Sequence, residues 1–237
     1  KKRNEVLSYV NDKPTSAAAE AVRNLRTSVM MANLDNPPQT ILVTSCLPGE
    51  GKTTASLMLA HNFAAVGKSV LLMEGDVRRR TLNEYFDVTE KRGLVSVLGG
   101  MAKLEDVVYK SDALGGDVLL TEESRVNAAD LFSSDKFKNF IEMAKTKYDV
   151  VIIDTPPVLV VPDARIVAQH VDAVLFNVKW NSTSQPQVQE ALRLFHNSGQ
   201  RIAGFILNGI SAKGMKYYGY GGKYGAYGAY DSKYYSS

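Results

Sequence analysis

Residues 45–54 read Ser-Cys-Leu-Pro-Gly-Glu-Gly-Lys-Thr-Thr, directly after the apolar run 40–44 and directly before an Ala/Leu-rich segment. A strand, a glycine-rich turn, Lys-Thr and a helix in this order form a P-loop, in which backbone N–H groups and the helix N-terminus surround phosphates. We expect Lys52 to reach the terminal phosphates and Thr53 to place its hydroxyl on Mg²⁺. The expected nucleotide contacts of this loop are Pro48, Gly49, Glu50, Gly51, Lys52, Thr53 and Thr54.

One glycine of the usual pattern is missing from this loop. The position five residues before Gly51 holds Cys46, so a strict pattern search would not find the motif. The strand before it and the helix after it identify the loop instead. We expect Cys46 to be a small residue that fills the loop, and a redox role is the alternative.

Short apolar runs alternate with helical patterns along the first 212 residues. The runs lack polar alternation, which is typical of strands covered on both faces of a parallel sheet. Apolar spacing of about 3.6 residues, with Ser133 and Ser184 as candidate N-caps, indicates helices. We expect strands at 40–44, 70–73, 118–121, 150–153, 173–178 and 202–207, and helices at about 16–33, 52–66, 133–147, 163–170 and 185–198. The alternation predicts an α/β, P-loop NTPase-like fold with a mostly parallel central sheet, helices on both faces and a ligand at the carboxyl ends of the strands.

Acidic residues stand at the ends of two further expected strands. They lie in 71–78 (Leu-Leu-Met-Glu-Gly-Asp-Val-Arg) and 150–157 (Val-Val-Ile-Ile-Asp-Thr-Pro-Pro). Acids beside a P-loop converge on Mg²⁺, which prefers oxygen ligands; Asp154 fills the place of a Walker B acid. Glu74 or Asp76 is suited to accepting a proton from an incoming hydroxyl, and the alternative is that both only hold the following arginines or cap a helix. The expected metal ligands are Thr53, Asp76 and Asp154, and the expected catalytic residues are Lys52, Asp76, Asp154 and Glu74.

Tyrosine dominates the end of the chain. Eight of the 12 Tyr lie at 217–235, interleaved with Gly, Ala and Lys and without Leu, Ile or Val. Such a segment cannot bury enough apolar surface to offset the entropy of ordering it, so we expect a domain over 1–212 and a disordered tail over 213–237. A row of mobile hydroxyls is typical of a substrate; a sticky low-complexity tail and a stacking surface for nucleic acid are the alternatives. The expected phosphoacceptors are Tyr217, Tyr218, Tyr220, Tyr224, Tyr227, Tyr230, Tyr234 and Tyr235.

The tail also carries the whole basic excess of the chain. Four of the 28 Lys and Arg and one of the 25 Asp and Glu lie from residue 213 on, so the preceding residues carry 24 of each sign. A neutral body gives no support to a nucleic-acid-binding face, and the single Cys excludes an intramolecular disulfide. The sequence has no run of 18 apolar residues and no signal peptide. It starts on Lys-Lys-Arg without an initiator Met, so we expect a fragment of a longer protein; the basic start suits the cytoplasmic leaflet of a membrane, or is an ordinary solvated terminus.

The three motifs in this order, joined to a tyrosine-rich C-terminus, resemble the bacterial tyrosine kinases (BY-kinases) that accompany capsular and exopolysaccharide export. The family's Walker A, Walker A′ and Walker B segments match the three stretches quoted above, and its terminal tyrosine cluster matches 217–235, so nearly the whole chain takes part. Residues 20–26, Glu-Ala-Val-Arg-Asn-Leu-Arg, resemble the Glu-x-x-Arg-x-x-Arg stretch through which such kinases form rings. Walker A′ usually reads Asp-x-Asp, and its first acid is here Glu74, one methylene longer.

The resemblance implies ATP and Mg²⁺ as cofactors and a homo-oligomeric ring, which is an octamer in the family. In the expected first helix Glu20, Arg23 and Arg26 fall on one polar arc that can pair with a neighbouring copy, and an ordinary solvated helix face is the alternative. The resemblance also implies a membrane co-polymerase segment in cis or in trans, a cognate tyrosine phosphatase and a location at the inner, cytoplasmic face of the bacterial plasma membrane. Similarity to the wider deviant P-loop ATPases implies that Asn208 contacts adenine.

These features predict transfer of the ATP γ-phosphoryl group to the tail tyrosines, in trans within the ring, as a regulator of polysaccharide polymerisation and export. A phenol with a pKa near 10 needs proton acceptance and alignment more than covalent help. A tail of about 25 residues spans on the order of 27 Å as a coil, enough to reach an adjacent subunit. Eight phosphates would move its charge from +3 to roughly −9 to −13 and so favour disassembly of the ring. The main rival function is a partition-type ATPase that only hydrolyses ATP, and a non-enzymatic binding module is the third.

Overall fold

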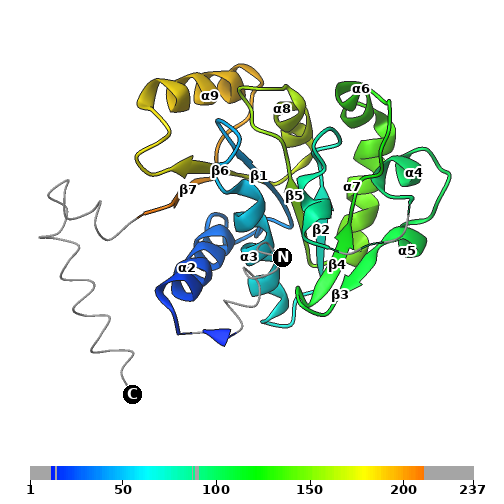
Figure 1. The fold of residues 1–237 in the computed structure, drawn as a ribbon, viewed down its shortest axis with the longest axis horizontal. Helices are drawn as coiled ribbons and strands as arrows, with labels where there is room; N and C mark the ends of the chain where they lie inside the picture. Colours follow the sequence, from blue (N-terminus) through cyan, green and yellow to red (C-terminus); the bar gives the residue numbers. More distant parts are fainter. Residues whose placement is uncertain (1–11, 14, 87, 89–90, 211–237) are drawn as a thin grey trace, which may run out of the picture.

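The computed structural model describes residues 12–13, 15–86, 88 and 91–210. They form a seven-stranded sheet in the order β3-β4-β2-β5-β1-β6-β7 with helices on both of its faces (Figure 1). The strands are β1 (Thr40–Ser45), β2 (Val70–Glu74), β3 (Tyr109–Ser111), β4 (Gly116–Leu119), β5 (Val150–Asp154), β6 (Ala173–Lys179) and β7 (Gly204–Asn208). The helices are α2 (Ala17–Met31), α3 (Lys52–Ala64), α4 (Leu94–Leu98), α5 (Leu104–Val107), α6 (Ala128–Phe132), α7 (Asp135–Lys147), α8 (Asp163–Val167) and α9 (Gln185–Asn197), with 3₁₀ turns η1 (Thr81–Glu84) and η2 (Ala168–His170).

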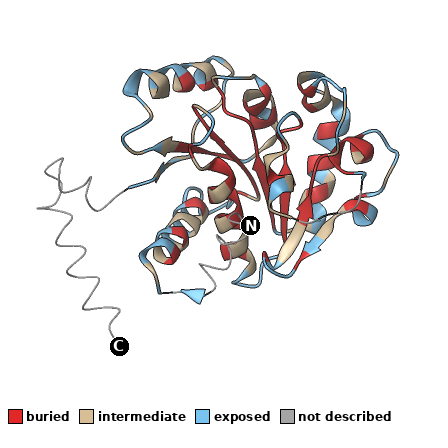
Figure 2. Ribbon diagram, in the orientation of Figure 1, coloured by how far each residue is buried: buried red, intermediate tan, exposed pale blue. Residues whose placement is uncertain are grey.

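The sheet is parallel except for its β3–β4 edge, and helices supply the crossovers that parallel neighbours require. Both faces are covered, since successive residues of a strand enter different apolar clusters. In β1, Ile41 and Val43 pack on the face covered by α2 and α3, and Leu42 packs on the face covered by α7, α8 and α9. Figure 2 shows the consequence: the central strands are buried and the outer sides of the helices are exposed. This confirms the predicted fold class and explains why the strands lack polar alternation.

The predicted elements are present, with errors at their ends. The helix expected from 133 begins at 135, because Ser134 caps α7 while Ser133 ends α6 by donating its N–H to the Ala129 carbonyl. The strand expected at 118–121 is β4, which ends at Leu119, because the next two residues bond outside the sheet ladder. The strand expected at 202–207 is β7, 204–208, and the helix expected at 163–170 is split into α8 and η2. The short helices α4, α5 and α6, the strand β3 and the turn η1 were not predicted.

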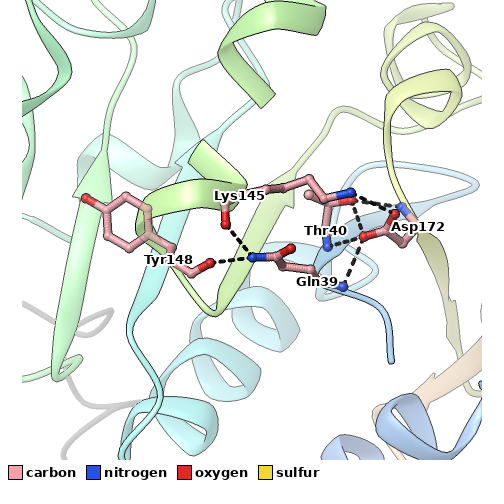
Figure 3. A network of polar contacts seen from close by, with 5 residues as sticks. All are labelled: Gln39, Thr40, Lys145, Tyr148 and Asp172. Carbon is pink, nitrogen blue, oxygen red and sulfur yellow. Dashed lines mark hydrogen bonds and ion pairs between the residues drawn. The ribbon is translucent and has the colours of Figure 1, made fainter. Parts of the chain in front are cut away.

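Polar contacts fix the amino ends of the strands, opposite the expected site (Figure 3). The Asp172 carboxylate accepts hydrogen bonds from the N–H groups of Gln39 (3.0 Å) and Thr40 (2.8 Å) and from the Thr40 hydroxyl, and it pairs with Lys145. The Gln39 side chain donates to the carbonyls of Lys145 and Tyr148 (both 2.7 Å). This network joins the starts of β1 and β6 to the end of α7 and leaves the carboxyl ends of the strands free to form a site.

Within the described ranges no helix is both long and apolar enough to cross a membrane.

Candidate phosphate-binding site

The P-loop joins β1 to α3 through two glycines in the left-handed region. Gly49 has φ +79° and Gly51 has φ +85°, values that side-chain-bearing residues rarely adopt. A Cβ on Gly51 would lie 2.5 Å from Nδ2 of Asn208, whereas the space at Gly49 is open. Because Gly51 is the N-cap of α3, Lys52 and Thr53 stand at the helix N-terminus, where free N–H groups and the helix dipole favour phosphate.

Side chains behind the P-loop hold its backbone in place. The Glu50 carboxylate accepts hydrogen bonds from the Leu47 N–H (3.0 Å) and from the Thr183 hydroxyl. The Asn208 amide donates to the carbonyls of Glu50 (3.3 Å) and Gly51 (3.5 Å). Glu50 and Asn208 therefore support the loop from β6–α9 and β7, and the expected adenine contact of Asn208 stays a prediction.

Cys46 occupies the place of the loop's usual first glycine. It is fully buried, and burial raises the pKa of its thiol to about 12, with the charge of Glu50 adding to the increase. Since the thiolate is the reactive form of cysteine, this thiol is inert at neutral pH. The environment supports the expectation that Cys46 fills space.

Asp154 ends β5 directly beside the loop, where Val43 of β1 is its partner in the sheet. The side chain is buried, and its Oδ1 accepts a hydrogen bond from the Ser56 hydroxyl (3.3 Å). Burial raises the pKa of Asp154 to about 6, while the charge of Lys52 and a hydrogen bond from Thr53 act to lower it. The sheet thus brings the expected Walker B acid to the lysine and threonine of the P-loop.

Asp76 has one carboxylate oxygen that the protein does not satisfy. Its Oδ1 accepts from the N–H groups of Arg78 (3.3 Å) and Arg79 (2.9 Å), whereas its Oδ2 is buried without a hydrogen-bond partner. A buried, unpaired carboxylate oxygen is an atom that a bound cation or its water would satisfy. Asp76 is also close enough to Asp154 for its charge to raise the pKa of that acid. With the Thr53 hydroxyl, these oxygens fit a magnesium site.

That site is only partly supplied by protein. No three His, Cys, Asp or Glu side chains are grouped as a metal cluster in the part of the chain that the structure describes. Mg²⁺ in nucleotide sites keeps waters and takes phosphate oxygens, so two carboxylates and one hydroxyl are a fitting protein share.

Glu74 is arranged differently from Asp76. It is fully buried at the end of β2, where Asp154 is its partner in the sheet, and both of its oxygens accept hydrogen bonds. Burial raises the pKa of Glu74 to about 7, hydrogen bonds from Thr121 and Leu82 lower it, and the charge of Asp154 raises it further. Of the two acids on this strand, only Asp76 has an unpaired oxygen.

A cavity of about 660 Å³ opens in front of the P-loop. It is lined by Pro48, Gly49, Gly51, Lys52, Thr53, Thr54, Arg79, Thr81, Glu84, Tyr85 and Pro157. The sequence predicted the P-loop half of this lining and missed the half that Arg79 and η1 provide. This half has no periodic pattern, and its chain turns through Arg80 at φ +48°. The sequence did offer one signal for this half of the lining: the segment directly follows the end of an expected strand, and loops at the carboxyl ends of parallel strands lie over the ligand edge of the sheet.

The remaining predicted residues lie away from the cavity. Glu20 and Arg23 form an ion pair within α2, and both are partly exposed. Arg26 instead donates to the carbonyl of Asn62 on α3 (3.1 Å), so it is engaged within its own subunit. Pairing of this helix with a neighbouring copy stays a prediction. The tail over 213–237, with Tyr217 to Tyr235, lies outside the described residues.

Comparison with known proteins gives one consistent family. Residues 38–200 match a family model described as an AAA domain. The tyrosine-protein kinase YwqD of Bacillus subtilis is 34% identical over 209 residues, which cover 88% of this chain and 88% of YwqD. The chain spans about 29% of the length of the first curated relatives it matches, which are also named as tyrosine-protein kinases.

Solved structures agree with these sequence relatives. The kinase domain of Escherichia coli tyrosine kinase ETK has a TM-score of 0.81 and 32% identity, over 85% of this chain and 79% of that chain. The septum site-determining protein MinD from Pyrococcus horikoshii, solved with Mg-ADP, has a TM-score of 0.60 and 25% identity, over 73% of this chain and 72% of that chain. The fold is therefore that of P-loop proteins, one of which was solved with Mg-ADP.

Proposed function

The chain belongs to the bacterial tyrosine-protein kinase family and carries its kinase domain, and we propose that it transfers the γ-phosphoryl group of ATP to tyrosine hydroxyls. The observation that carries the proposal is the unpaired Oδ2 of Asp76, whose charge acts on Asp154 beside a P-loop that presents Lys52 and Thr53. A P-loop binds the phosphates of a nucleotide, and a free buried carboxylate beside it suits the charge handling of phosphoryl transfer.

We assign each residue a role from its position in the site. Lys52, at the N-terminus of α3, binds the terminal phosphates and stabilises the charge that develops on them. Asp154 holds its charge beside Lys52 and Thr53 and orients both groups. Asp76 faces the same region and is placed to hold the metal or to accept the phenol proton. Mg²⁺, when bound, would neutralise phosphate charge and align the reacting oxygens.

The acceptors that we propose are the eight tyrosines at 217–235, modified in trans by an adjacent subunit of a ring. The tail is basic and the site contributes buried acids, so their charges favour docking before transfer. Phosphates on these tyrosines reverse the sign of the tail, which would expel it from the site and loosen the ring. By the same reasoning we propose a role in regulating polysaccharide polymerisation and export, with a membrane co-polymerase segment and a tyrosine phosphatase as partners.

The test is incubation of the purified chain with ATP and Mg²⁺, followed by mapping of phosphotyrosine by mass spectrometry. We expect phosphotyrosine at 217–235 in the parent protein and none in Lys52→Met, whose circular dichroism should be unchanged. ATP hydrolysis without phosphotyrosine would instead favour a partition-type ATPase, to which the likeness to MinD gives structural support. Static light scattering before and after ATP tests ring disassembly, which an unchanged mass with a phosphorylated tail would contradict.

A further inference from the structure

Glu74 points into the same side of the sheet as the catalytic groups but does not contact the cavity in front of the P-loop. It is the register partner of Asp154, and directly paired residues of parallel strands project to the same face. That face is the one covered by α3, since Asp154 bonds to Ser56 of that helix. Like Asp76 and Asp154, Glu74 is not among the residues that line this cavity, whereas Thr81, Glu84 and Tyr85, seven, ten and eleven positions further along the chain, are.

The Glu74 carboxylate is saturated by donors from two other segments. Its Oε1 accepts from the N–H of Leu82 (2.7 Å), and its Oε2 accepts from the N–H of Thr121 (3.2 Å) and from the side-chain amide of Asn83. The Asn83 amide also donates to the Thr121 carbonyl (3.3 Å). Leu82 and Asn83 belong to η1, and Thr121 follows β4, so one carboxylate ties the turn to the sheet.

The turn that Glu74 holds is one wall of the cavity. Thr81, Glu84 and Tyr85 line the cavity together with the P-loop residues, while Leu82 between them is fully buried in the apolar core. A wall of this kind faces whatever approaches the terminal phosphate. The position of η1 therefore decides where an acceptor hydroxyl can stand.

We propose that Glu74 is a positioning residue: its carboxylate fixes η1 as the acceptor-side wall of the cavity and takes no part in binding the metal. Reach explains the choice of glutamate, because aspartate at this position would withdraw the carboxylate by about one carbon–carbon bond, roughly 1.5 Å. The bond to the Leu82 N–H would then exceed hydrogen-bond distance unless the turn moved. The assignment to the acceptor side rests on the proposed kinase function, whereas the locking of η1 does not.

The experiment compares three variants with the parent protein. Glu74→Asp keeps the charge and loses reach, and Asp76→Asn is the matched control for a metal residue. Glu74→Gln keeps reach, loses the charge and replaces one accepting oxygen with an NH₂ donor, so one of the two groups of hydrogen bonds is lost. Hydrogen–deuterium exchange of the protein without nucleotide or metal reports on η1 directly. We expect the Leu82 amide to exchange about tenfold faster in Glu74→Asp and at an unchanged rate in Asp76→Asn.

Titration of Mg²⁺ against a fluorescent ATP analogue separates positioning from metal binding. The Mg²⁺ midpoint should rise about tenfold or more in Asp76→Asn and stay within about twofold of the parent in Glu74→Gln. The KM for a tyrosine peptide should rise in Glu74→Asp while the ATP affinity is kept. Unchanged exchange at Leu82 in Glu74→Asp, or an equal midpoint shift in Glu74→Gln and Asp76→Asn, would overturn the proposal.

A second variant keeps the test decisive if Glu74→Asp does not fold. Asn83→Ala removes one donor from the turn and leaves Glu74 in place, so it should speed exchange at Leu82 without moving the Mg²⁺ midpoint. Unchanged exchange in this variant would also count against the lock. Hydrogen–deuterium exchange and the Mg²⁺ titration need no phosphorylation. Absence of kinase activity would therefore refute the proposed function without affecting the test of how Glu74 holds η1.

Discussion

The two glycines of the P-loop give a matched pair of substitutions. Gly49 and Gly51 have nearly the same φ, +79° and +85°, but a Cβ would meet nothing within 4 Å at Gly49 and the Asn208 amide at 2.5 Å at Gly51. Alanine in the left-handed region costs about 1–2 kcal/mol, so Gly49→Ala should lower the free energy of unfolding by that amount. Gly51→Ala bears the same cost and also displaces the amide from two backbone carbonyls, each bond being worth about 0.5–1.5 kcal/mol. We expect a total of about 2–5 kcal/mol for Gly51→Ala.

Urea denaturation without nucleotide measures both values, and Asn208→Ala closes a double-mutant cycle. Truncation of Asn208 leaves its Cβ, 3.8 Å from the added methyl group, which is ordinary contact. In that background Gly51→Ala should cost only the backbone term, about 1–2 kcal/mol, so the coupling energy should be about 1–3 kcal/mol. Equal costs for Gly49→Ala and Gly51→Ala, or a cost of Gly51→Ala that Asn208→Ala does not relieve, would refute the reasoning.

Three further predictions concern polar contacts. Burial acts to raise the pKa of Asp172, but hydrogen bonds from the start of β1 hold it below the usual 3.8. The stability that the ionised carboxylate contributes is therefore present above pH 3.8 and is lost as the pH falls through the lowered pKa. Asp172→Asn should therefore cost about 1–2 kcal/mol at pH 7 and progressively less as the pH falls below 3.8, measured by urea titration at pH 7 and at a series of acidic pH values. Arg78→Ala leaves the fully buried Asp163 carboxylate without its counter-ion and should cost about 2–4 kcal/mol, part of which Asp163→Asn should restore in thermal unfolding. Thr183→Val removes the hydroxyl donor of Glu50 and should weaken ATP-analogue binding about three- to tenfold in fluorescence titration, with circular dichroism unchanged.

The sequence was sufficient for the parts of this fold that depend on local chemistry. The P-loop could be predicted despite Cys46. The glycines at 49 and 51 adopt a positive φ that few other residues tolerate, and the Lys-Thr pair that follows completes the motif. The central strands could be predicted because they are apolar on both faces. The predicted ends of the elements were less accurate. Whether a serine such as Ser133 ends one helix or caps the next depends on its contacts with the preceding helix rather than on its own propensity.

The cavity wall could not be predicted from the sequence, because it depends on contacts distant in the chain. The turn η1 has no apolar period and is placed by Glu74 and Thr121, the latter nearly 40 residues further along. The two acids of 74–76 could be told apart only in part, since Asp76 alone was expected on the metal while both were expected to be catalytic. β2 ends at Glu74, and Gly75, which separates the two acids, lies against β5: its N–H donates to the Asp154 carbonyl (2.8 Å), and a Cβ there would lie 3.1 Å from that oxygen.

Free energy decides which of these two acids is the better metal residue. A hydrogen bond to a charged group contributes about 1.5–3 kcal/mol, and Glu74 would have to give up at least one of its donors, and move η1 with it, before an oxygen became available. Asp76 offers an oxygen at no such cost, and leaving that oxygen buried and unpaired is itself unfavourable by about 1–3 kcal/mol. Both terms favour Asp76, together by about 2.5–6 kcal/mol, which is roughly a factor of 60 or more in binding. A glutamate in place of the usual aspartate at position 74 is therefore compatible with an intact metal site. The residue that we assign to the metal is Asp76, and the longer side chain at position 74 leaves it unchanged.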